Sequence, residues 1–139
     1  MNKIFVDTNI LVYAHSIHAG AKHAFAKQAI RSLWESGNGI LSTQVLQELC
    51  VTLQHRSTPA LSTDEVRQVL RDYLLWEVVP NTPPMVVQAY EIQLRHRISF
   101  WDAMILLAAE IAGASILYSE DFSAGHKYGS IQVVNPLQK

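Results

Sequence analysis

The amino-acid sequence predicts an α/β protein, a three-layer α/β/α sandwich with a central parallel β-sheet. Short apolar runs alternate along the chain with longer segments in which apolar residues recur at helical spacing. Residues that commonly cap helices stand where the longer segments begin, and glycines stand where several of them end. Strands that alternate with helices in this way form parallel sheets with helices on both faces.

The first part of the chain is predicted to begin with a buried strand. The apolar run at 4–6 stops at Asp7, which is typical of a strand that leads into a loop. Thr8 and Asn9 are then expected to cap a helix, and the Ser-Gly-Asn-Gly sequence at 36–39 is expected to end another. In order, the predicted elements are a strand at 4–6, helices at 10–15 and 21–35, a strand at 39–42 and a helix from Thr43 to about Arg56.

The second part of the chain has clear helix starts. Ser62, with Glu65 three residues later, forms a capping box. Another helix begins at Ser99, is apolar almost all round and ends at Gly113, so it should lie near the centre of the fold. In order, the predicted features are a break at 57–59, a helix from Ser62 to Tyr73, a strand at 77–79, a helix from Thr82 toward Arg97, a helix at 100–112, and strands at 115–118 and 130–134 joined by a loop at 119–129.

Length and composition indicate one domain, residues 1–139, without repeats or linkers. Hydrophobic residues make up 49% of the chain and charged residues 17%, which favours a well-packed globular protein over a disordered one. Cys50 is the single cysteine, so neither a disulfide framework nor a zinc site is expected. The sequence indicates no signal peptide and no membrane-spanning segment, and a cytoplasmic location is the expectation.

Four acidic residues are the candidates for a functional site. Asp7 directly follows the first strand, and Asp121 lies three residues after the strand that ends at Tyr118. Parallel sheets bind ligands beyond the carboxyl ends of their strands, so both side chains can point into one crevice. Asp102 lies in the first turn of the most apolar helix, and Glu48 lies at the margin of another helix's apolar stripe. All four carboxylates can therefore converge.

Clustered carboxylates predict a site for a hard divalent cation, Mg²⁺ or Mn²⁺. Such acids repel one another and raise each other's pKa, which a bound cation offsets. A cation held by carboxylates and waters can orient a phosphodiester and activate the attacking water, which is the chemistry of hydrolytic nucleases. A net charge of −1 provides no broad basic face for RNA, so the metal must supply much of the attraction.

Each of these acids also has a purely local explanation. Asp7 can simply cap a helix, and Asp102 has capping-box spacing to the serine before its helix. Glu48, at the edge of an amphipathic helix, can be solvated, and Asp121 stands beside a second acid in a polar loop. The basic run at 95–97 is expected to be a solvated helix end, and no histidine is assigned a role.

Four short sequence motifs surround the acids in a fixed order. They are 4–13, with Asp-Thr-Asn at 7–9; 42–49, Ser-Thr-Gln-Val-Leu-Gln-Glu-Leu; 99–103, Ser-Phe-Trp-Asp-Ala; and 117–122, Leu-Tyr-Ser-Glu-Asp-Phe. Together with the ending at 133–137 they resemble the PIN-domain ribonucleases of the VapC toxin type, over nearly the whole chain. Each motif is weak alone, but four in the right order are specific.

This resemblance implies a hydrolase that cuts structured RNA internally and leaves a 3′-hydroxyl and a 5′-phosphate. It implies that one or two Mg²⁺ or Mn²⁺ ions are bound by Asp7, Glu48, Asp102 and Asp121, and that these acids are supported through hydrogen bonds by Thr8, Asn9 and Ser119. Proteins of this kind are commonly toxins that a small antitoxin protein silences, and they commonly form homodimers. The RNA substrate, the antitoxin partner and the dimer are expectations from the resemblance.

Rival functions remain open at this point. A catalytically silent PIN-like domain could bind RNA or a protein, although its acids would then have no reason to be intact. A phosphatase that uses Asp7 as nucleophile would want a second acid where this chain has Asn9. No glycine-rich phosphate loop follows any strand, which disfavours a nucleotide-binding module. Glu120 beside Asp121 leaves open which of the two faces the metal, and the motif favours Asp121.

Overall fold

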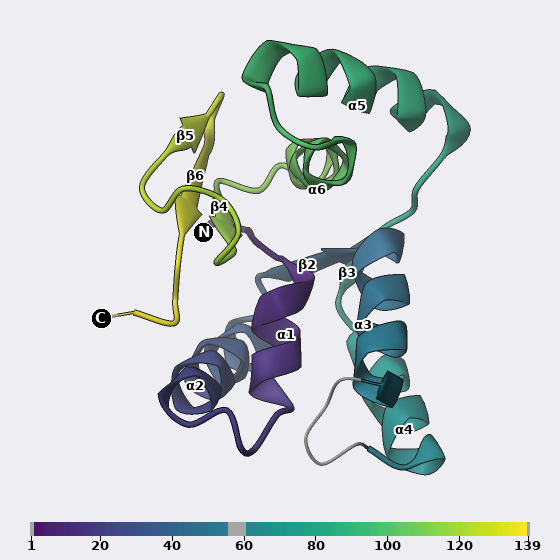
Figure 1. Cartoon of the computed structure of the whole chain (residues 1–139), viewed down its shortest axis with the longest axis vertical. Coiled ribbons are helices and arrows are strands. Elements are labelled where there is room, and N and C mark those ends of the chain that lie inside the picture. The colour runs from purple at the N-terminus through teal and green to yellow at the C-terminus, as the bar shows by residue number, and fades with distance from the viewer. Residues whose placement is uncertain (1, 56–60, 139) are drawn as a thin grey trace.

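A computed structural model describes residues 2–55 and 61–138, in which strands alternate with helices (Figure 1). The strands are β1 (Ile4–Val6), β2 (Gly39–Ser42), β3 (Glu77–Val79), β4 (Ile116–Tyr118), β5 (Lys127–Tyr128) and β6 (Ile131–Val134). The helices are α1 (Thr8–Ala14), α2 (Ala21–Ser36), α3 (Thr43–His55), α4 (Thr63–Tyr73), α5 (Pro83–His96) and α6 (Phe100–Ile111).

The described strands form one six-stranded sheet in the order β3-β2-β1-β4-β6-β5. β1 pairs in parallel with both β2 and β4, and the pairs β2–β3 and β4–β6 are also parallel. The chain adds β2 and β3 on one side of β1 and then crosses over to place β4 on the other side. The boundary between β1 and β4 is therefore the switch point, where open α/β sheets bind their ligands.

Helices cover both faces of the sheet, which confirms the predicted three-layer α/β/α sandwich. In Figure 1, α5 and α6 lie on one side of the strands, and α1, α2 and α3 lie on the other. α5 packs on α6, while α1 packs against both α2 and α3. No helix in the described residues is long and apolar enough to cross a membrane.

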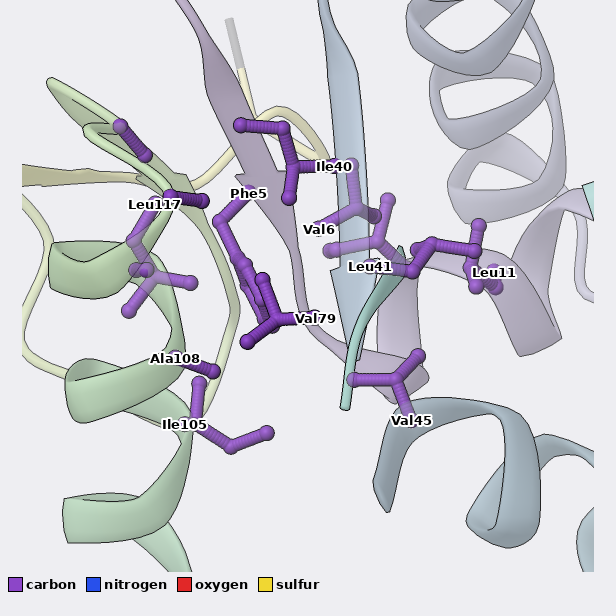
Figure 2. Close-up of a cluster of buried hydrophobic side chains, with 14 of the residues drawn as sticks. Phe5, Val6, Leu11, Ile40, Leu41, Val45, Val79, Ile105, Ala108 and Leu117 are labelled. Carbon is purple, nitrogen blue, oxygen red and sulfur yellow. The ribbon is translucent and has the colours of Figure 1, made fainter. Parts of the chain in front are cut away.

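The apolar core is divided between the two sides of the sheet (Figure 2). Phe5 lies toward Ile105 of α6, whereas Leu41 lies toward Leu11 of α1. Burial on both faces explains why the central strand β1 is a continuous apolar run instead of an alternating one. Every residue of α6 from 103 to 109 is buried, as expected for a central helix.

Capping hydrogen bonds are present at the N-termini of α1, α4 and α6. Ser62 and Glu65 form the predicted capping box, because each side chain accepts a hydrogen bond from the other's backbone N–H. Ser99 Oγ accepts from the N–H of Asp102 at 3.1 Å. The prediction for α1 was wrong in detail: the helix begins at Thr8, and its N-cap residue is Asp7, whose carboxylate accepts from the N–H of Thr8.

One edge of the sheet differs from the prediction. The segment expected to be a loop at 119–129 contains β5, which pairs antiparallel with β6. A strand of two residues carries no recognisable periodicity, and only the pairing with β6 defines it. The predicted break at 57–59 and the predicted helix end at Arg56 lie outside the described residues.

Gly39 begins β2 directly beneath the ring of Trp76. A Cβ atom on Gly39 would lie 2.4 Å from Cζ3 of Trp76. The ring has little freedom to move away, because it lies against the rings of Tyr73 and Trp34 at centroid distances of 5.2 and 5.3 Å. This position therefore needs a residue without a side chain so that backbone and ring can approach closely.

Gly39→Ala should lower the free energy of unfolding by about 1–3 kcal/mol, because the added methyl group overpacks the site and displaces the Trp76 ring. Chemical denaturation of both proteins measures the difference. In a Trp76→Leu background the same substitution should cost less than about half as much, since the two changes share one contact. An equal penalty in both backgrounds would contradict the packing explanation.

Candidate active site

The candidate site lies at the carboxyl ends of β1 and β4, where backbone hydrogen bonds continue beyond the strands. The N–H of Asp7 donates to the carbonyl of Tyr118 at 2.9 Å, which places the residue after β1 beside the end of β4. Ser119 and Asp121 follow β4 in the next loop. The parallel pairing thus brings Asp7 and Ser119 together although 112 positions separate them in sequence.

The carboxylate of Asp7 is buried and held by two donors. Asp7 is only 6% exposed. The N–H of Thr8 donates to its Oδ1 at 2.8 Å, and Oγ of Ser119 donates to its Oδ2 at 2.8 Å. Oγ of Ser119 itself accepts from the N–H of Asp121 at 3.0 Å. These contacts fix both oxygens of Asp7 and connect them to the loop after β4.

Burial raises the pKa of Asp7 from its ordinary value of 3.8 to about 7. Desolvation is the largest cause, since the charged form loses its hydration. The hydrogen bonds from Ser119 and Thr8 lower the pKa in part, and the negative charges of Asp121 and Glu48 raise it again. A positive charge bound near Asp7 would stabilise the carboxylate and offset both the burial and the repulsion.

Asp102 lies in the first turn of α6, where the N-cap Ser99 holds its backbone. Desolvation raises the pKa of the Asp102 carboxyl, the hydrogen bond with Ser99 lowers it, and the charge of Asp121 raises it again. The local explanation of Asp102, a favourable position at a helix start, is therefore compatible with a role in the site. The effect of the Asp121 charge indicates that the first turn of α6 lies near the loop after β4.

Thr8 connects Asp7 to the acid of α3. While the backbone N–H of Thr8 donates to Asp7, its hydroxyl Oγ1 donates to Oε1 of Glu48 at 2.8 Å. Glu48 is an exposed residue on the helix after β2. The contact with Thr8 holds its carboxylate toward β1, so Glu48 is not merely a solvated charge at a helix margin.

The two neighbouring acids of the β4 loop point to different places. Glu120 accepts from the hydroxyl of Tyr13 at 2.8 Å through Oε1 and from Lys22 at 3.0 Å through Oε2. Asp121 lines the cavity that also contains Asp7, whereas Glu120 does not line it. Asn9 also serves this loop, because its Oδ1 accepts from the N–H of Glu120 at 3.4 Å.

All four candidate acids line one cavity of about 660 Å³. The four carboxylates offer oxygen atoms as metal ligands, and oxygen ligands suit Mg²⁺ or Mn²⁺ better than zinc or copper. Within residues 2–55 and 61–138, no three acidic, histidine or cysteine side chains are close enough to hold one metal ion jointly. Magnesium keeps several waters and is commonly held by one or two carboxylates, so this wider arrangement of acids fits a hydrated divalent cation.

The family model described as PIN domain matches residues 4–126, which include every acid of the cavity. This chain belongs to the PIN domain family. Among solved structures, the PIN domain resembles VapC20 of Mycobacterium tuberculosis, described as a sarcin-ricin loop cleaving toxin, with a TM-score of 0.68 and 25% identity. The similarity covers 87% of this chain and 92% of that one. A comparison with curated protein sequences finds no significant match.

Gln44 and Trp101 are among the cavity-lining residues of this PIN domain that the sequence did not indicate as site residues. Gln44 is 4% exposed, its Nε2 donates to the backbone carbonyl of Trp101 at 3.3 Å, and its buried Oε1 has no partner among the described residues. Trp101 is exposed at the cavity beside Asp102. Both residues stand in the sequence motifs, Gln44 on a helix and Trp101 beside a candidate acid. The motifs do not show that the side chain of Gln44 is buried and that of Trp101 exposed.

The metal-free PIN domain should become less stable as the pH rises from about 4 to about 7, because the folded protein retains the Asp7 proton that the unfolded chain has already released. The contribution of one such group is at most about 1.4 kcal/mol per pH unit. Urea denaturation in chelator at several pH values measures this slope. Asp7→Asn should flatten this slope. The control Asp64→Asn should leave it intact, because Asp64 lies in the first turn of α4 and its side chain is 93% exposed. A slope that Asp7→Asn does not change would contradict the assignment.

Proposed function

We propose that this PIN domain is an RNA-cleaving toxin, an endoribonuclease that depends on Mg²⁺ or Mn²⁺. The observation that carries the proposal is the buried carboxylate of Asp7, whose pKa is raised to about 7 in a cavity that contains three further acids. A protein gains nothing in stability from such an arrangement, because each acid raises the cost of ionising the next. The structural similarity to a toxin that cleaves the sarcin-ricin loop supports RNA as the substrate.

The proposed metal ligands are Asp7, Glu48, Asp102 and Asp121, of which one or two would bind the hydrated ion directly and the others through its waters. A bound Mg²⁺ or Mn²⁺ would supply positive charge for the phosphodiester and a water of lowered pKa. Ser119 and Thr8 keep both Asp7 oxygens in place, and Thr8 also holds Glu48. Asn9 lines the same cavity and supports the loop after β4, because its Oδ1 accepts from the N–H of Glu120.

The composition of the cavity supports the need for a cation. Among the described residues that line it, none is lysine or arginine. A polyanion such as RNA would be repelled by four carboxylates without a compensating positive charge. The requirement for a divalent ion thus follows from substrate binding as well as from the chemistry of hydrolysis.

We further propose that a cognate antitoxin protein binds and silences this domain, on the basis of the similarity to a toxin. The homodimer, the single-domain organisation over residues 1–139 and the cytoplasmic location stay predictions from the sequence. Co-expression and co-purification with a candidate antitoxin tests the pairing, and light scattering of the purified protein tests the dimer.

Purified wild type should cut total cellular RNA at discrete sites with Mg²⁺ or Mn²⁺ and should be inactive in chelator. Asp7→Asn and Asp102→Asn should each reduce cutting by more than about 100-fold while the proteins remain folded, because each removes a proposed metal ligand. The exposed control Asp64→Asn should cut like the wild type. The rate of RNA cutting measures the metal dependence, the loss in the two variants and the activity of the control, and mapping of the cut ends identifies the sites.

Two outcomes would contradict this proposal. Cutting that persists equally in both variants would indicate a contaminating nuclease. If no preparation cuts RNA while the wild type still binds it, the protein would be a catalytically silent PIN-like domain that binds RNA and not a toxin.

Asp121→Asn should weaken Mn²⁺ binding by at least about tenfold in calorimetry, whereas Glu120→Gln should change it by less than roughly twofold. Both variants remove one negative charge from the same loop, so they form a matched pair. The difference follows from their partners, since Glu120 is engaged by Tyr13 and Lys22 while Asp121 lines the cavity. An equal loss in both would indicate a general charge effect.

A further inference from the structure

Trp101 is an exposed aromatic side chain at the candidate active site. It lies beside Asp102 on α6, it is 63% exposed, and it lines the same cavity as the acids. Its ring contacts that of Phe100 in an edge-to-face geometry, with centroids 5.3 Å apart and planes 79° apart. Phe100 thus supports the ring without covering it by stacking. A tryptophan this exposed contributes little to the core and is a candidate contact for a ligand.

The backbone that carries Trp101 is fixed from two directions. Ser99 caps α6 through the N–H of Asp102. The buried side chain of Gln44, on α3, donates through Nε2 to the carbonyl of Trp101 at 3.3 Å. These two contacts join α3 to the first turn of α6 and fix the backbone from which the side chains of Trp101 and Asp102 extend.

The cavity is poorly suited to bind RNA through the phosphates alone. Lysine and arginine, which usually neutralise phosphates, are absent from the described residues that line it, and its charged groups are carboxylates. Its remaining walls include apolar side chains such as Val12, Val51 and Ile105. Base stacking on an aromatic ring adds about 1–3 kcal/mol per base and does not depend on a basic surface.

We infer that Trp101 is the stacking platform of a nucleobase subsite beside the acids, and that this subsite takes an unpaired base of the RNA. The inference rests on the proposed ribonuclease function and specifies its substrate class. A base within a duplex has both faces covered by its neighbours, whereas a base in a loop can be turned out and stacked on an aromatic ring. Gln44 is a positioning residue that acts through the backbone of Trp101.

Equilibrium binding of two fluorescent hexaribonucleotides tests the subsite. One is a hexamer of adenosine, and the other is an abasic hexamer with the same length and charge. Measurement with Ca²⁺ provides a hard cation for the oxygen ligands, and gel analysis of the same samples reports any cleavage. The ratio of the two dissociation constants isolates the contribution of the bases, because the phosphates are common to both.

The wild type should bind the adenosine hexamer roughly 5- to 150-fold more tightly than the abasic one, as expected for one stacked base. Trp101→Leu should bring this ratio close to one and leave the affinity for the abasic hexamer unchanged. Trp101→Phe should retain most of the ratio, because an aromatic ring remains. Gln44→Met should lower the ratio to a value between that of the wild type and one. The affinity for the abasic hexamer should stay the same, whereas a general loss of structure would reduce it.

Tyr90→Leu is the matched control, because Tyr90 is 52% exposed on α5 and does not line the cavity. This variant should keep the wild-type ratio. The inference would be overturned if the wild type showed no preference for the hexamer with bases, or if Trp101→Leu kept the preference. Base-dependent binding by a wild type that cuts no RNA would support the subsite and reject the proposed nuclease. If the wild type cuts RNA but Trp101→Leu keeps the wild-type ratio of dissociation constants, the nuclease would be supported and the subsite rejected.

Discussion

The buried carboxylate of Asp7 is the constraint on which the rest of the site depends. The parallel pairing of β1 with β4 places Asp7 beside Ser119, and the two donors that hold its oxygens come from one residue on each side of that pairing. Burial would otherwise favour the protonated acid, as the raised pKa of Asp7 indicates. The fold thus fixes the orientation of the Asp7 carboxylate but places no positive side chain beside it among the described residues that line the cavity. A bound cation would compensate its negative charge.

The other acids are arranged around Asp7 by contacts that also support the fold. Thr8 begins α1 and holds Glu48 of α3, so the first turn of one helix positions the side chain of another. Ser99 caps α6 and thereby fixes Asp102. Local capping and participation in the site are therefore not competing explanations for these residues, because the same helix starts that need capping lie at the carboxyl ends of the strands.

The cavity combines a negative lining with an exposed aromatic ring. This combination separates two tasks that many RNA-binding surfaces give to lysine and arginine. In the proposed enzyme, a divalent cation compensates the phosphate charge, and stacking on Trp101 supplies affinity for the base. The nearly neutral chain thus needs no broad basic face to act on RNA, and its selectivity would favour bases that are free of a duplex.

The sequence by itself determined the layers of the fold, most helix starts and the four candidate acids, because apolar runs, capping residues and short motifs are local patterns. It misassigned the cap of α1, since adjacent polar residues can cap equally well until the path of the backbone is known. The two residues of β5 are a strand only through their pairing with β6. Tertiary structure alone decided that Tyr13 and Lys22 engage Glu120 while Asp121 lines the cavity, and that Gln44 holds the backbone of Trp101. These contacts join residues far apart in sequence, and no local pattern records which distant side chain will be close enough to bond.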